Sequence, residues 1–128
     1  IFPLELEKRQ NVADNYNKHI NQLNLGIKTP VLIKEATSSW AQYTIILPDE
    51  INRDTLQENL KSKNIPTAVY YPIPLNEHKP YEKYPVSHEG LSNTIYLSKN
   101  VLSLPMHPYL SESDIILIVK SIAEAIKS

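Results

Sequence analysis

The sequence predicts an α+β fold, in the form of a two-layer α/β sandwich whose helices cover one face of a small mixed sheet. Apolar residues recur at helical spacing near both ends of the chain, and two β-rich runs, 40–47 and 65–71, flank a third helical pattern. The chain has 128 residues, of which 41% are hydrophobic and 21% are charged. This length suits one compact domain, residues 1–128, and is too short for two.

The first predicted element is a long helix over residues 4–25, in which charged residues separate the apolar positions. Pro3 suits the first turn of this helix, and Gly26 suits the position just past its end. The apolar positions that support the prediction are Leu4, Val12, Tyr16, Ile20 and Leu23.

Three strands and a second helix are expected next. A short strand is predicted over 31–36, and a stronger one over 40–47, which is rich in aromatic and β-branched residues. The helix is predicted over 52–63, because its first residue is an asparagine that can cap it. The third strand is predicted over 65–71, with Pro66 near its start, where a missing N–H does no harm.

Residues 72–90 are rich in proline, tyrosine and histidine, so a long ordered loop is predicted, and such loops often carry function. A helix over 91–99 and a strand over 101–104 follow. Ser111 and Asp114 form the outline of a capping box at the start of a closing helix. One face of that helix carries Ile115, Ile118, Val119, Ile122 and Ile126.

Composition excludes several classes of function. Lys and Arg total 13 and Asp and Glu total 14, a balance of −1 that argues against a nucleic-acid binder. No apolar run is long enough to span a membrane. The absence of cysteine excludes disulfide scaffolds, thiolate metal sites and cysteine nucleophiles, and two glycines are too few for a glycine-rich phosphate loop.

The chain begins at Ile1, and its single methionine is Met106, so we expect a longer polypeptide to precede it. No signal-peptide pattern is present, and a cytoplasmic location is expected. A metal site is conceivable only around His78 and His88 in the 72–90 loop, but their spacing favours solvated polar side chains instead.

The most informative run is Val69 to Asn76, in which Tyr70 and Tyr71 end a predicted strand before rigid proline turns. Adjacent strand residues point to opposite faces, so one tyrosine can pack inward while the other presents its ring and hydroxyl to a ligand. The alternative is that both tyrosines only cover the sheet edge. His107 lies between two prolines, which favours a rigid turn with a smaller chance of a functional histidine.

Trp40 and Gln42 are expected on one strand face, with Ala41 and Tyr43 on the other. Gln42 is either a ligand contact or a buried amide that pairs with the backbone. The residues alone favour the buried amide.

These residues also carry a family resemblance. Over essentially the whole chain, the sequence resembles the C-terminal part of the DegT/DnrJ/StrS aminotransferases. The segments that carry the resemblance are Leu6–Arg9 with Val12, Ala13 and Tyr16, then Ser39–Ile45, then Arg53 with Leu56 and Leu60, then Ile65–Leu75, and finally Leu102–Leu110.

The resemblance implies a fold-type I aminotransferase that depends on pyridoxal phosphate (PLP). Such enzymes transfer an amino group, commonly from glutamate, to a keto-sugar carried on a nucleotide, in surface-polysaccharide or amino-sugar biosynthesis. In the family, the Schiff-base lysine and the cofactor-binding residues lie in a large N-terminal domain, and their motif has no counterpart here. The resemblance therefore implies that this chain is the small C-terminal domain, that residues 1–25 are the inter-domain helix, and that the chain alone binds no cofactor and is inactive.

The resemblance also implies substrate-binding residues. Tyr70 and Tyr71 match family positions that touch the nucleotide-sugar substrate. Asn76 stands where the family frequently has histidine. The resemblance therefore implies that this residue can bind substrate by hydrogen bonds, but that it cannot gain or lose a proton near neutral pH. His107 matches a family Met-His-Pro motif and either orients the cleft or fixes the turn. No catalytic or metal-binding residue is expected in this chain, and the full-length enzyme is expected to be a homodimer.

Two other functions remain open. The chain is alternatively a stand-alone regulatory or nucleotide-sugar-binding module that does not catalyse a reaction. A third possibility is a purely structural role, in which the first and last helices provide dimer and inter-domain packing.

Overall fold

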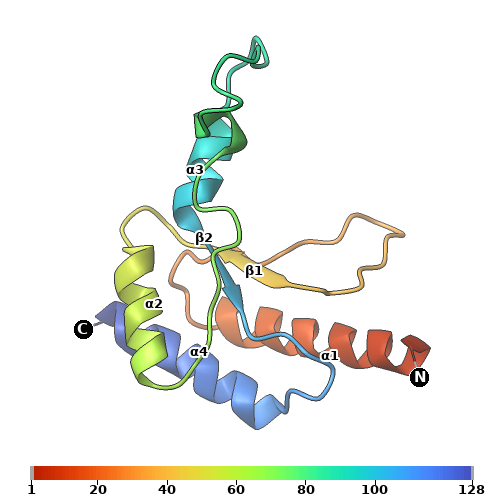
Figure 1. Cartoon of the computed structure of the whole chain (residues 1–128). Coiled ribbons are helices and arrows are strands. Elements are labelled where there is room, and N and C mark those ends of the chain that lie inside the picture. Colours follow the sequence, from red (N-terminus) through yellow and green to blue (C-terminus); the bar gives the residue numbers. More distant parts are fainter. Residues whose placement is uncertain (1, 128) are drawn as a thin grey trace.

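A computed structural model describes residues 2–127 and confirms the α+β fold class (Figure 1). Figure 1 shows α1 and α4 on the same side of the two strands, while α3 and the loop before it extend away from them. In chain order the elements are α1 (Phe2–Asn21), β1 (Tyr43–Ile46), α2 (Arg53–Ser62), the short 3-10 helix η1 (Leu75–Glu77), α3 (Ser92–Asn100), β2 (Val101–Leu104) and α4 (Glu112–Lys127).

The sheet is smaller than the sequence predicts, and it is antiparallel rather than mixed. Its described strands, β1 and β2, pair from Tyr43 opposite Leu104 to Ile46 opposite Val101. One isolated bridge extends each edge, Lys28 with Ile46 and Ala68 with Ser103. The core lies between this sheet and the helices, because the buried residues of β1 and β2 form one cluster with those of α1, α2 and α4.

The predicted strand over 65–71 is wrong, because only Ala68 pairs with β2, through two backbone hydrogen bonds with Ser103 of 2.9 and 3.0 Å. Pro66 has no N–H to donate, and the Thr67 carbonyl accepts a hydrogen bond from the Gln57 side chain of α2 instead. This segment therefore runs along the sheet edge with a single bridge.

The predicted strand over 31–36 is also wrong. Val31 and Ile33 are 87% and 79% exposed, and the Ala36 N–H donates to the Ile33 carbonyl in a turn. Glu35 has a φ of 67°, in the left-handed region that extended strands do not use. The β-branched residues in this run predicted a strand, but pairing with the edge of β1 stops at the bridge between Lys28 and Ile46 and does not continue into residues 31–36.

The first helix ends four residues earlier than predicted, since α1 runs from Phe2 to Asn21 and the prediction ended at residue 25. Asn24 and Gly26 both have positive φ, of 53° and 69°, so the chain leaves the helical conformation before Gly26.

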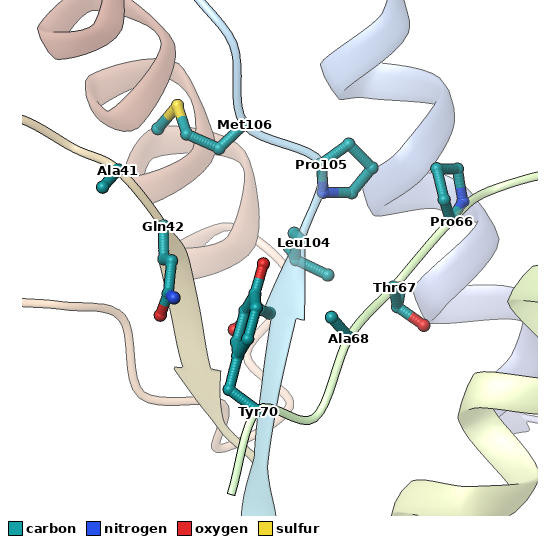
Figure 2. Close-up of a pocket in the computed structure, with 10 residues that line it drawn as sticks. Ala41, Gln42, Pro66, Thr67, Ala68, Tyr70, Leu104, Pro105 and Met106 are labelled. Atoms are coloured by element: carbon teal, nitrogen blue, oxygen red, sulfur yellow. The ribbon is translucent and has the colours of Figure 1, made fainter.

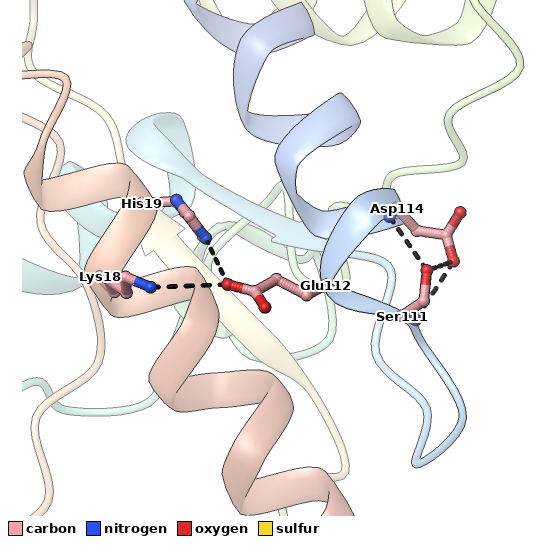
Figure 3. Close-up of polar contacts among 5 residues, drawn as sticks. All are labelled: Lys18, His19, Ser111, Glu112 and Asp114. Atoms are coloured by element: carbon pink, nitrogen blue, oxygen red, sulfur yellow. Dashed lines mark hydrogen bonds and ion pairs between the residues drawn. The ribbon is translucent and has the colours of Figure 1, made fainter.

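Both predicted helix caps are confirmed. The Asn52 side chain accepts from the Thr55 N–H at the start of α2. At the start of α4, the Ser111 hydroxyl accepts from the Asp114 N–H at 3.1 Å, and the Asp114 carboxylate accepts from the Ser111 N–H at 3.2 Å (Figure 3). These hydrogen bonds satisfy donors that a helix start otherwise leaves unpaired.

An ion-pair cluster ties α4 to α1. The Glu112 carboxylate lies 3.3 Å from the His19 ring nitrogen and 3.5 Å from the Lys18 ammonium (Figure 3). Farther along α4, Glu124 pairs with Lys63, which follows α2. These contacts hold the three helices in one layer around the buried face of α4, which carries Ile115, Ile118, Val119 and Ile122.

Candidate functional site

The adjacent residues Tyr70 and Tyr71 line two different cavities. Both rings reach solvent, with 53% of Tyr70 and 80% of Tyr71 exposed. Tyr70 lies at a bend in the chain, so the two neighbouring side chains line different cavities without regular strand geometry. Of the two alternatives that the sequence leaves open, an inward tyrosine is not observed, because both residues are exposed.

The Tyr70 cavity has a volume of about 210 Å³ and lies over the end of β2 (Figure 2). Most of its wall is apolar, and Gln42 and Tyr70 bring side-chain polar groups to it. The Ser103 hydroxyl is already paired with Thr44 at 2.7 Å. The residues around the cavity are Ala41, Gln42, Pro66, Thr67, Ala68, Tyr70, Ser103, Leu104, Pro105 and Met106.

Thr67 has a buried hydroxyl with no hydrogen-bond partner among the described residues. Figure 2 shows this hydroxyl turned away from Tyr70. We therefore do not assign it to the wall that a ligand in this cavity would meet.

The interpretation of Gln42 as a buried amide is wrong, because this residue is exposed at the mouth of the cavity. The cause is the backbone of Trp40, whose φ of 45° places a bulky residue in the left-handed region. This conformation breaks strand alternation, so Trp40 and Tyr43 are both buried, at 4% and 0% exposure, although regular alternation predicts that they lie on opposite faces.

Three hydrogen bonds hold Trp40 in this conformation. Its indole Nε1 donates to Gln10 Oε1 at 2.7 Å, its N–H donates to the Ser38 hydroxyl at 3.0 Å, and its carbonyl accepts from Arg9 at 2.9 Å. Arg9 and Gln10 belong to α1. The first helix therefore determines how the chain after Trp40 reaches the cavity wall. No pattern in the 40–47 run indicates these contacts with the helix.

Two buried tyrosines support the same wall from below. The Tyr16 ring of α1 stacks on the Tyr43 ring of β1, with centroids 4.7 Å apart. The Tyr16 hydroxyl donates to the Pro105 carbonyl at 2.9 Å, and the Tyr43 hydroxyl donates to Asn17 at 2.6 Å. Burial raises the pKa of both phenols well above the ordinary value, so both remain neutral donors.

Tyr71 and Asn76 lie on a separate part of the molecule. Tyr71 lines a mostly apolar cavity of about 380 Å³ with His78, and Asn76 lines one of about 440 Å³ with Tyr81 and Tyr84. Leu75 and Thr94 line both cavities, so these two sites are neighbours. Neither cavity includes Tyr70.

His107 lines none of the cavities described here and is exposed. Its Nδ1 accepts from the Tyr109 N–H at 3.3 Å, and its carbonyl accepts from the Leu110 N–H at 3.2 Å. These bonds close the turn before α4. The geometry therefore supports the turn-fixing role of His107 more than a role in a cleft.

The cavities described here do not fit PLP. Lys28 is the lysine that lines one of them, and that cavity also holds the carboxyl-bearing residues Asp49 and Glu50, which repel a phosphate. Within residues 2–127, no group of three or more His, Asp or Glu side chains could hold a metal ion, and no helix is long and apolar enough to cross a membrane.

The fold and sequence together define a class of protein. A sequence model of the DegT/DnrJ/EryC1/StrS aminotransferase family matches residues 2–123, and the chain belongs to this family. Among its relatives, it is 38% identical to the UDP-2-acetamido-2-deoxy-3-oxo-D-glucuronate aminotransferase of Pseudomonas aeruginosa, over 90% of this chain and 30% of that protein. It is 33% identical to the "pleiotropic regulatory protein" of Geobacillus stearothermophilus, over 92% of this chain and 31% of that protein.

The same likeness holds in three dimensions. A crystal structure of a DegT DnrJ EryC1 StrS aminotransferase from Brucella abortus matches with a TM-score of 0.82 and 38% identity, over 92% of this chain and 30% of that one. The chain thus spans about 30% of the length of the relatives that it matches.

Proposed function

We propose that this chain is the C-terminal, substrate-side domain of a PLP-dependent aminotransferase that transfers an amino group, from glutamate, to a nucleotide-linked keto-sugar. The observation that carries the proposal is the match to the aminotransferase family over residues 2–123, with a chain that spans about 30% of its relatives' length. In this proposal an N-terminal domain outside the chain holds the cofactor, which supplies an electron sink for the transfer.

The chain's own contribution is to bind and orient the sugar nucleotide. Tyr70 offers an exposed aromatic face and a hydroxyl at a small cavity, a combination suited to a ring that also forms hydrogen bonds. We assign Tyr71 and Asn76 to a second contact region, and His107 to the turn that leads into α4. No residue of this chain is assigned a catalytic role.

Exposed apolar side chains support the proposal that another domain packs against this chain. Between residues 73 and 97, two tyrosines and four aliphatic side chains are at least 39% exposed on a segment that extends from the body of the fold (Figure 1). Large apolar side chains that gather on one exposed segment often belong to an interface. We propose that the N-terminal domain, in its own subunit or in a homodimer, covers them. They are Ile73, Leu75, Tyr81, Tyr84, Val86 and Leu97.

The experiment that tests this function uses the chain joined to the polypeptide encoded upstream of Ile1. Glutamate and a nucleotide-linked keto-sugar are supplied, and 2-oxoglutarate release is measured. We expect turnover that requires both domains. Absence of turnover with every nucleotide-linked keto-sugar tested, in a protein that retains PLP, would contradict the proposal.

A second candidate function is a regulatory module that binds a nucleotide sugar without converting it. The observation that favours it is the 33% identity to a protein named as a pleiotropic regulator. The same assay separates the two functions, because the module binds the nucleotide sugar but releases no 2-oxoglutarate.

A further inference from the structure

The cavity beside Tyr70 carries an inference about substrate selection, which rests on the function proposed above. We propose that Gln42 and Tyr70 together bind a neutral ring of the nucleotide-linked substrate, either its base or its sugar, and that the Gln42 amide selects that ring by hydrogen bonding.

The charge of the cavity indicates a neutral ligand group. None of its lining residues is Lys, Arg, His, Asp or Glu. A diphosphate is normally held by cationic side chains or by the N-terminus of a helix, and neither type of residue nor a helix start is among the residues that line this cavity. The diphosphate of a sugar nucleotide therefore belongs elsewhere, and one of its uncharged ends suits this cavity.

The polar groups available to such a ring are few and complementary to it. The Gln42 amide offers two donor hydrogens and an acceptor oxygen, and the Tyr70 hydroxyl offers one donor. Within residues 2–127, neither side chain has a hydrogen-bond partner, whereas the Ser103 hydroxyl in the same wall is paired with Thr44. Bases and sugars both carry donors and acceptors at a ring edge, which this amide can pair with.

The shape of the cavity suits a single ring. Pro66, Leu104, Pro105 and Met106 provide apolar wall, and the Tyr70 ring provides an aromatic face (Figure 2). Such surfaces pack against the face of a base or the C–H face of a sugar. At about 210 Å³ the cavity is smaller than the pockets of roughly 300–1,000 Å³ that hold drug-sized ligands, so it takes one ring and not the whole substrate.

The backbone that carries Gln42 is ordered before any ligand binds. Trp40 is held in the left-handed conformation by three hydrogen bonds, two of them to α1, and Gln42 follows two residues later. A backbone that is already ordered loses less entropy when the side chain captures a ligand. Strained backbone conformations of this kind recur at binding sites.

The test follows the Gln42 side-chain amide in NMR spectra of the chain, with the signal assigned by its loss in Gln42→Glu. Uridine, N-acetylglucosamine and inorganic pyrophosphate are titrated separately. We expect either uridine or N-acetylglucosamine to shift the Gln42 signal, which identifies the base or the sugar as the occupant, and pyrophosphate to leave it unchanged. A shift caused by pyrophosphate alone, or by none of the three, would overturn the inference.

Affinity for UDP-N-acetylglucosamine, as a probe nucleotide sugar, provides the second readout. Gln42→Ala is expected to weaken binding about tenfold, because two neutral hydrogen bonds are lost, while the matched control Gln22→Ala, at an exposed position just past α1, leaves it unchanged. Equal affinity of Gln42→Ala and the unsubstituted chain would overturn the role of Gln42 and leave the proposed function intact. Turnover by the longer protein, measured separately, decides whether that function itself fails.

Discussion

The indole Nε1 of Trp40 donates to the Gln10 side-chain oxygen at 2.7 Å, and this bond joins two residues 30 positions apart in the sequence. It fixes the single tryptophan of the chain against α1, although the backbone of Trp40 lies in the left-handed region. The relationship matters for the site because the residues that follow Trp40 form one side of the Tyr70 cavity. We therefore expect this hydrogen bond to contribute both to the stability of the fold and to the geometry of the cavity.

Replacing Gln10 with alanine is expected to destabilise the fold by about 1–2 kcal/mol, because the buried indole N–H loses its acceptor. Alanine favours helices, so a loss of stability cannot come from helix propensity. Urea unfolding followed by the fluorescence of Trp40 measures the effect. Gln22→Ala is the control, and equal stability of the two variants would contradict the role of this bond.

Arg53 links the start of α2 to the end of α3. Its side chain is 14% exposed, and its guanidinium donates to the Ser98 carbonyl in the last turns of α3. Arg53→Ala is expected to cost about 2 kcal/mol, since a hydrogen bond from a charged donor is lost and α3 has few other supports. Thermal unfolding measures the change. Amide hydrogen exchange should rise most in α3, and a uniform rise across the chain would contradict this local role.

Stability is expected to fall in acid through the cluster that joins α4 to α1. The hydrogen bond from His19, and then the Lys18 ammonium, lower the pKa of Glu112 below its ordinary value of 4.5. A carboxyl whose folded pKa is lowered stabilises the fold above its unfolded pKa, and this contribution is lost as the pH falls through the folded value.

Glu112→Gln should therefore reduce the difference in urea midpoint between about pH 6 and about pH 3. The loss need not be complete, because the pKa values of Asp114 and Glu124 are also lowered, by hydrogen bonds from Ser111 and Lys63. An unchanged pH difference in Glu112→Gln would show that the contact with His19 and Lys18 does not form in solution.

In the longer enzyme, Tyr70→Phe and Tyr71→Phe are expected to raise KM for the nucleotide sugar more than they reduce PLP retention. Loss of one hydroxyl contact corresponds to roughly 1 kcal/mol, or about a fivefold rise in KM. Tyr109→Phe is the matched control, because the Tyr109 hydroxyl bonds to Glu5 on α1 and lines none of the described cavities. Unchanged KM in both test variants would count against the assignment.

The sequence predicts the parts of this fold that depend on local chemistry. The Asn52 cap and the Ser111–Asp114 capping box lie within four residues of their partners, and both form as expected. The strands at 31–36 and 65–71 fail because pairing depends on distant segments, and Ala68 finds Ser103 only through the fold.

The candidate site likewise has one residue that the sequence indicates and one that it does not. Tyr70 is recognisable from its place beside a proline turn, and the resemblance assigns it to the substrate. Gln42 is misjudged, since its exposure follows from the bonds that Trp40 makes with Arg9 and Gln10. No periodicity in the strand could indicate those bonds.

The central claim is that this chain provides the substrate side of an aminotransferase whose cofactor is held by a polypeptide outside it. The most direct measurement is the visible absorbance of PLP retained after dialysis, by the chain alone and by the chain joined to its upstream polypeptide. We expect the chain alone to retain no lysine-bound PLP and the longer protein to retain it. Stable lysine-bound PLP on the chain alone would contradict the claim.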